Sequence, residues 1–138
     1  MADAHDSPRA RLLIENILHP GEVDRFTAGA TPTSPEDFPG LRLRIQAHVA
    51  VIERASIGRA VVDVDAAQAV ARVLTTLLDE PDQFDDHGRE MIRGAVEYFV
   101  LDRDEHRDLT DAIGFDDDAR VVNAVVDALR RSDLRIEL

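Results

Sequence analysis

Four aspartates in the second half of the chain have a spacing that could serve a cation site. Asp104 and Asp108 are four residues apart, so one turn of helix would place both carboxylates on the same face. Asp117 and Asp118 follow beyond Gly114, and a loop that folds back would bring the two pairs together. Carboxylate oxygens are the ligands that Ca²⁺, Mg²⁺ and Mn²⁺ prefer, so these four aspartates are a candidate metal site.

Helix capping and ion pairing explain the same aspartates without a metal. Asp117 and Asp118 open a predicted helix, where backbone amides and the helix dipole favour acids. Asp104 and Asp108 have arginines close by in the sequence with which they could form ion pairs. The tract is also not an EF-hand calcium site, because Arg107 stands where that loop requires glycine. We therefore favour capping and ion pairing, and predict no cofactor unless these aspartates bind a divalent cation.

Other residues with ligating or catalytic chemistry give weaker patterns. His87 and Glu90 are three residues apart and could share a helix face and a metal, although a surface pair of this kind is usually solvated. His48 is expected at the edge of the core. No serine has a Gly-x-Ser-x-Gly setting and no glycine-rich loop resembles a phosphate cradle, so we assign no catalytic residue.

Most of the net charge of −12 belongs to one region of the chain. Residues 79–118 hold fifteen acids against four arginines, so the other residues are close to neutral. Such a surface repels phosphates, which excludes nucleic acid, and it would select a protein partner with a basic surface. The chain has no cysteine and no apolar run approaching the roughly 20 residues that span a bilayer, so we expect a cytoplasmic protein.

Apolar residues at helical spacing predict an all-α fold, a small irregular bundle of four to five helices in one domain spanning 1–138. Three helices are expected in the second half. The first is capped by Asp63 or Asp65 and runs to Leu78, and the second is capped by Asp85 or Asp86 and runs to Val100. The third follows Gly114, with Arg130 and Arg131 in its final turn. Val96, Phe99, Val122, Val125 and Leu129 are expected to pack together.

The first half of the chain is less regular. Ser7-Pro8 predicts a helix start, and His19-Pro20-Gly21 predicts its end. Residues 20–40 are rich in proline and glycine and are expected to be mostly loop, with one helical turn over 34–37. Residues 1–6 and 132–138 are expected to be frayed.

Residues 41–57 fit two structures. Leu41, Leu43 and Ile45 alternate with polar residues, which is the period of a strand that could pair with 60–64. Leu41, Ile45, Val49 and Ile52 also form a helical stripe, and the alanines between them favour a helix, which is our prediction.

The tract from Tyr98 to Asp118 resembles the signature of the YkvA-like family of small bacterial helical proteins. The acids of that signature fall on Asp104 and Asp108, its glycine on Gly114, and its closing pair on Asp117 and Asp118, with an apolar helix following. Departures lie at the family's proline positions, which carry Asp102, Arg107 and Asp111, and at its apolar pair, which is Glu105-His106. The resemblance covers residues 86–129 and implies an all-helical fold with no established activity.

We expect a small soluble helical protein that binds a partner or assembles with itself, with one acidic face. The partner would be a protein with a basic surface or a second copy in a homodimer. The alternative is a metal-binding or metal-dependent hydrolase domain centred on the aspartates of 104–118.

Overall fold

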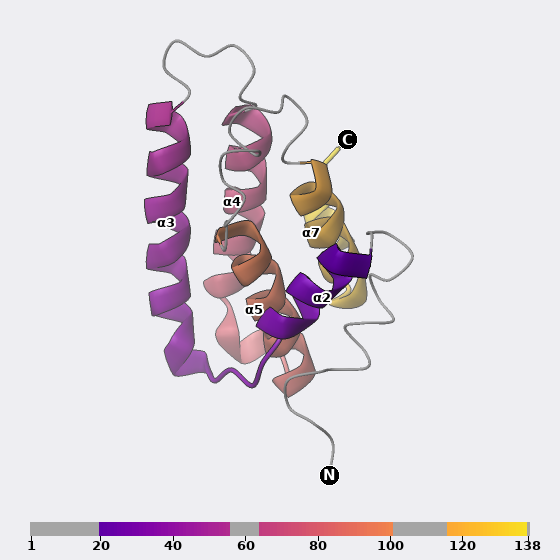
Figure 1. The fold of residues 1–138 in the computed structure, drawn as a ribbon. Coiled ribbons are helices and arrows are strands. Elements are labelled where there is room, and N and C mark those ends of the chain that lie inside the picture. Colours follow the sequence, from indigo (N-terminus) through magenta and orange to yellow (C-terminus); the bar gives the residue numbers. More distant parts are fainter. Residues whose placement is uncertain (1–19, 56–63, 101–115, 138) are drawn as a thin grey trace.

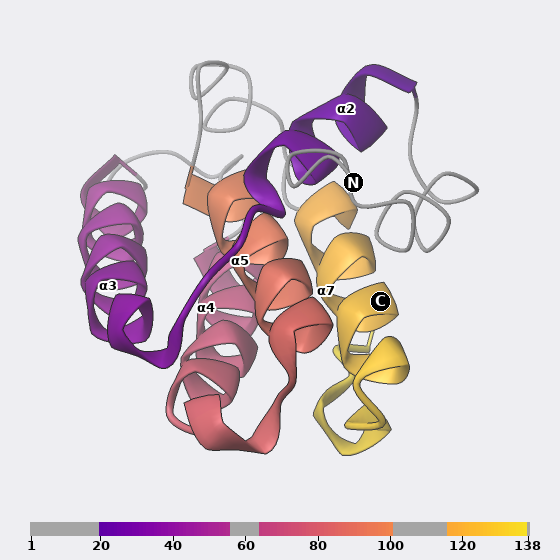
Figure 2. The same cartoon turned by 90° about the horizontal axis from the view of Figure 1, so that it is seen from below.

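The computed structural model describes residues 20–55, 64–100 and 116–137, and these ranges contain helices and no β-strand. The α-helices are α2 (Pro20–Gly29), α3 (Phe38–Ala55), α4 (Val64–Leu78), α5 (Asp86–Val100) and α7 (Asp116–Ala128). Short 3₁₀ helices are η1 (Pro35–Asp37), η2 (Pro81–Gln83) and η3 (Ser132–Leu134). The predicted all-α bundle is therefore confirmed. Figure 1 shows α3, α4 and α5 side by side, and Figure 2 shows α3 at one edge with α7 on the opposite side.

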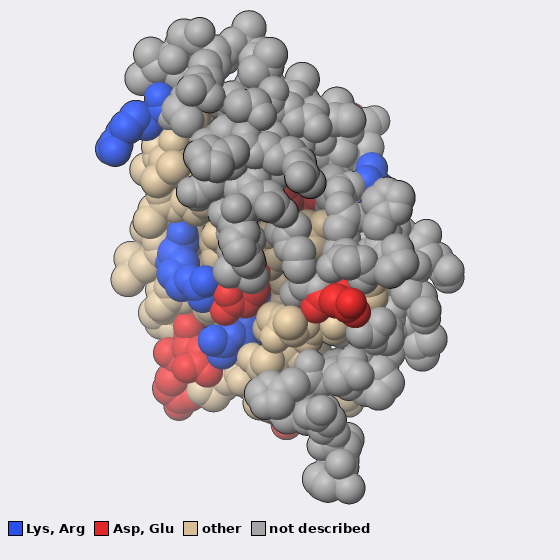
Figure 3. All heavy atoms as spheres, viewed as in Figure 1, with Lys and Arg blue, Asp and Glu red and all other residues tan. Residues whose placement is uncertain are grey.

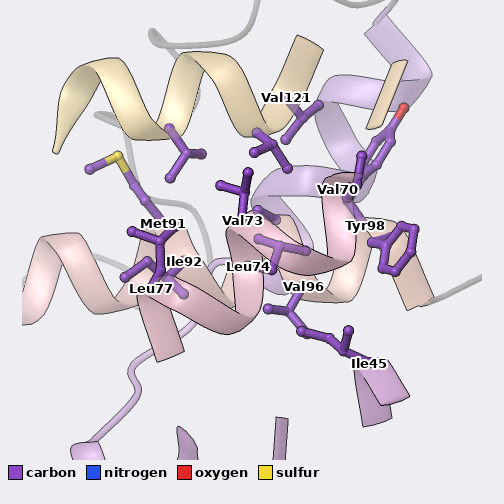
Figure 4. Packing of buried hydrophobic residues seen from close by; sticks show 14 of the residues in the cluster. Ile45, Val70, Val73, Leu74, Leu77, Met91, Ile92, Val96, Tyr98 and Val121 are labelled. Carbon is purple, nitrogen blue, oxygen red and sulfur yellow. The ribbon is translucent and has the colours of Figure 1, made fainter. Parts of the chain in front are cut away.

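The core forms around α4, which contacts α3, α5 and α7. The apolar residues of α4 recur at helical spacing, so one face is buried along its whole length. Side chains from α3, α5 and α7 converge on this face (Figure 4). The predicted cluster is part of this core: Val96, Phe99, Val122 and Val125 are at most 2% exposed, and Leu129 packs against its edge.

Residues 41–55 belong to a helix, as predicted, and the strand alternative is wrong. A strand would place Leu41, Leu43 and Ile45 on one face. In α3, Leu41 and Ile45 are buried, whereas Leu43 is 65% exposed. The alternating pattern thus arises because α3 carries apolar residues on two faces, of which the core covers one.

The prediction of loop over 20–40 is wrong for residues 20–29, which form α2. Pro20 stands at the first described position of this helix, and proline is tolerated in the first turn of a helix. Phe26 and Ala30 of the α2 segment are fully buried, and a Cβ atom at Gly94 of α5 would lie 3.0 Å from each of these side chains. The missing side chain of Gly94 therefore lets α2 pack closely on α5. The helical turn predicted over 34–37 is present as η1.

The end of α7 also differs from the prediction. The helix stops at Ala128, and Arg130 adopts the left-handed conformation with φ 63°, so neither Arg130 nor Arg131 lies in its last turn. Residues 132–137, which we expected to be frayed, are held by the amide of Asn123: its Nδ2 donates to the Ile136 carbonyl at 2.9 Å, and its Oδ1 accepts from the Ile136 amide at 2.7 Å. An asparagine can replace a backbone partner in this way because it carries both a donor and an acceptor.

Candidate functional site

Only one of the four predicted metal ligands has a described side chain. Asp118 lies in the first turn of α7 and is 5% exposed. Asp117 belongs to the same turn, but its side chain lies outside the described part of the structure, as do Asp104 and Asp108. Among the described side chains, no group of three or more histidines and acids could hold a metal ion. The metal site stays a prediction.

The two histidines singled out from the sequence occupy different surroundings. His87 is exposed near the start of α5, with Glu90 half-buried one turn later. His48 is half-buried on α3, and its ring meets that of Phe99 edge-on, with centroids 4.9 Å apart and planes at 86°. His48 thus lies at the edge of the core, as expected, where it adds an aromatic contact between α3 and α5.

The acids of residues 79–90 gather where α4 leads into α5, and most of them are used within the fold. Asp85 caps α5 by accepting a hydrogen bond from the amide of Gly88 at 2.8 Å. Three others form ion pairs: Asp79 with Arg42 at 2.5 Å, Glu80 with Arg131 at 2.5 Å, and Asp86 with Arg89 at 3.2 Å. The arginines neutralise much of this region, so it is less negative than the sequence suggests.

A partly buried ion-pair cluster joins α3 to α5. Arg44 donates to both carboxylate oxygens of Glu97, at 2.8 and 2.9 Å, and Arg93 donates to one of them at 3.4 Å. Glu97 is only 15% exposed at its side chain. The hydrogen bonds from Arg44 lower the pKa of the Glu97 carboxyl, against the opposing effect of burial, and the same contact raises the pKa of Arg44. The cluster therefore links α3 to α5 beside their apolar contacts.

The outward face of α3 carries a line of apolar residues that no other described element covers. Leu43 is 65% exposed and Val51 is 49% exposed, and the structure records no other large hydrophobic residue as exposed within the described ranges. Ala47 and Ala50 lie exposed between them. Leu43, Ala47 and Val51 recur every four positions, and Ala50 is three positions from Ala47, so the four residues form one continuous line, here called the α3 stripe.

The α3 stripe is continuous with an open groove between α3 and α4. The groove has a volume of about 430 Å³ and an apolar floor that includes Ile45, Val49 and Ala71. Ala50 lines the groove as well as the α3 stripe. At one end the side chain of Gln68 donates to Glu53 at 2.7 Å and so links the two helices. The apolar surface of α3 is therefore wider than two isolated side chains.

Acidic residues precede α3, and its last turn carries the basic Arg54 beside Glu53. Glu36 and Asp37 lie exposed immediately before the helix, and Arg54 lies exposed in its last turn. Hydrogen bonds from its own backbone amide and from Ser34 lower the pKa of the Glu36 carboxyl, which is therefore charged at neutral pH. Arg54 takes part in none of the ion pairs between described residues. Figure 3 shows mostly uncharged atoms along the edge that α3 occupies in Figure 1, with a basic side chain at its upper end, further basic side chains about halfway down and acidic ones at its lower end.

Comparisons with family models, with curated proteins and with solved structures give no match for this chain. The resemblance to the YkvA-like family is not tested by them and stays a prediction. None of the described helices is both long enough and apolar enough to cross a membrane.

Sequence reasoning missed the α3 stripe, although a signal was present. The segment over 41–52 has more apolar positions than one core-facing stripe requires, which is why it also fitted a strand. A helix with a second apolar face is typical of a surface that contacts another molecule.

Proposed function

We propose that this protein is a protein-binding module whose working surface is the α3 stripe. The observation that carries the proposal is the exposure of Leu43 and Val51 on one line with Ala47 and Ala50, beside an apolar groove. Single exposed apolar residues are common on monomers, whereas a continuous apolar surface marks an interaction site. Burying a leucine or valine side chain fully contributes about 1.5–3 kcal/mol, so covering these two residues contributes a useful share of a binding free energy.

The shape of the surface favours a helix as the partner element. A straight helix face that presents residues at every turn, next to a groove between two helices, matches the contacts that a second helix makes along its length. The expected preference for a basic partner has less support, because arginines of the chain itself pair with Asp79, Glu80 and Asp86. The cytoplasmic location expected from the cysteine-free sequence is part of this proposal.

A photo-crosslinking amino acid tests the proposal without removing any residue of the stripe. Gln46 is exposed, lies on α3 and lines the groove, so benzoylphenylalanine at this position would reach a molecule bound to the stripe. Gln83 is exposed in η2 and provides a matched position far along the chain. We expect a covalent adduct on irradiation of cells carrying the Gln46 probe and none from the Gln83 probe.

Changing the stripe itself gives the second arm of the experiment. The adduct should disappear in a Leu43→Glu/Val51→Glu background, because two carboxylates would be desolvated on binding. Both residues are largely exposed, so this background should keep the fold. Equal labelling from Gln46 and Gln83, or an adduct that survives both glutamates, would refute the α3 stripe as the binding surface.

A further inference from the structure

We propose that the occupant of the α3 stripe is the α3 stripe of a second copy of this chain, arranged antiparallel about a two-fold axis. This inference rests on the proposed function and names the partner. It is carried by the equal spacing of Leu43 and Val51 about Ala47 and by the opposite charges of Glu36 and Arg54.

Three of the four residues of the α3 stripe are placed symmetrically about one position, and Ala50 is the exception. Leu43 and Val51 lie four residues on either side of Ala47, which corresponds to about 6 Å along a helix axis in each direction. A two-fold axis through Ala47 places Leu43 against the partner's Val51 and Val51 against the partner's Leu43. Each large side chain then meets a large one, and the small side chains at the centre let the two helices approach to about 8–10 Å. This is the self-complementary arrangement that an isologous dimer requires.

The charges select the antiparallel direction over the parallel one. Arg54 is seven residues from Ala47, or about 10 Å along the axis, and Glu36 is roughly 17 Å away in the other direction. In the antiparallel pair the end of the helix with Arg54 therefore lies beside the partner's Glu36, within reach of two extended side chains. A parallel pair would place like charges together at both ends, which is unfavourable.

The remaining charged residues of α3 are Arg42, Arg44 and Glu53. Glu53 precedes Arg54, but it accepts a hydrogen bond from Gln68 of α4 at 2.7 Å and lines the groove. Arg42 and Arg44 flank the stripe, but each forms an ion pair inside its own chain, with Asp79 and Glu97 respectively. The positive charges of Arg42 and Arg44 are therefore neutralised within each chain, and they do not repel the second copy. Because the contact involves one helix from each copy, it belongs to the small interfaces, and we expect a dimer that dissociates at about micromolar concentrations.

Sedimentation equilibrium of the full chain over about 1–500 µM tests the dimer, a range chosen to bracket that affinity. The parent chain should move from monomer to dimer as concentration rises. Ala47→Glu would place two carboxylates against each other on the axis, so this variant should remain monomeric with an unchanged circular dichroism spectrum. Ala28→Glu makes the same replacement at an exposed position of α2 and should dimerise like the parent.

Engineered cysteines test the direction of pairing, and the chain has no native cysteine to interfere. Leu43→Cys and Val51→Cys are prepared as separate proteins and oxidised alone or mixed. In the antiparallel pair the two positions face each other, so the mixture should form an interchain disulfide and neither protein alone should do so. A charge exchange completes the test: Arg54→Glu should weaken the dimer several-fold, and Glu36→Arg in the same chain should restore it.

The outcomes separate the inference from the proposed function. A parent chain that stays monomeric, a dimer that persists in Ala47→Glu, or a disulfide formed by Leu43→Cys alone overturns the inference. If the Gln46 probe then gives an adduct with another protein, the binding module stands with a different partner. If the Gln46 probe gives no adduct at all, both proposals fail.

Discussion

Replacing Arg130 by glycine should stabilise the protein. Arg130 follows α7 with φ 63°, a conformation that costs an L-residue about 1–2 kcal/mol and costs glycine nothing. The hydrogen bonds define a helix-ending motif in which this position is usually glycine: the amide of Arg131 donates to the carbonyl of Val126 at 2.7 Å, and that of Arg130 to the carbonyl of Asp127 at 3.1 Å. The side chain of Arg130 is exposed, so little packing is lost.

The expected change in the free energy of unfolding is the balance of one stabilising and two destabilising contributions. Relief of backbone strain contributes about 1–2 kcal/mol, and the greater freedom of glycine in the unfolded chain removes about 0.5–1 kcal/mol. Loss of a positive charge near a helix C-terminus removes a further few tenths of a kcal/mol. We therefore expect Arg130→Gly to raise the free energy of unfolding by about 0.5 kcal/mol, which raises the melting midpoint by about 2 °C for a chain of this size.

Arg130→Ala is the matched control, because alanine removes the same charge and keeps the strain. Urea unfolding followed by circular dichroism should rank Arg130→Gly above Arg130→Ala by about 1 kcal/mol. The slope of the unfolding curve should be the same for both variants. If alanine is as stable as glycine, the left-handed conformation of Arg130 is not strained, and the reasoning is refuted.

Three further predictions concern the core, the ion-pair cluster and the aspartates. Phe99→Ala should lower the free energy of unfolding by about 3–5 kcal/mol, because Phe99 is 2% exposed, and Phe99→Leu should cost much less; a melting midpoint within a degree or two of the parent's would contradict its burial. Glu97→Gln should cost about 1–2 kcal/mol at pH 7, between the values for exposed and buried ion pairs. The pKa of Glu97 is lowered below its usual 4.5, so the stability that its carboxylate contributes is present above pH 4.5 and is lost as the pH falls through the lowered pKa. Urea unfolding should therefore show the difference in free energy of unfolding between parent and variant becoming smaller in acid. EDTA or millimolar Ca²⁺, Mg²⁺ or Mn²⁺ should leave the parent's melting midpoint unchanged, whereas a rise with one ion that is absent in Asp117→Asn/Asp118→Asn would establish the metal site.

The sequence by itself determined the helices α4, α5 and most of α7. Each carries a single apolar face at helical spacing, so the period leaves one interpretation. Pro81 marks the end of α4, and Asp85 or Asp86 marks the start of α5, of which the structure selects Asp85 as the cap. The cluster of Val96, Phe99 and Val122 followed from the same spacing, because helices joined in sequence usually pack side by side.

Tertiary contacts decided the remaining elements. Pro20 can end one helix or begin the next, and the burial of Phe26 against Gly94 is what makes α2 a helix. The order of residues 132–137 depends on Asn123, whose amide can bond to the backbone only because the chain returns past α7. Local propensity contains no information about either contact.

The α3 stripe shows most clearly which features follow from the sequence and which depend on tertiary packing. Spacing establishes that α3 has apolar residues on two faces, but it does not say which face the bundle covers. The packing of α4 and α5 buries Leu41, Ile45 and Ile52 and leaves Leu43 and Val51 exposed. The burial of an apolar side chain depends on the neighbours that reach it, so only the tertiary structure could separate the core of this protein from its candidate binding surface.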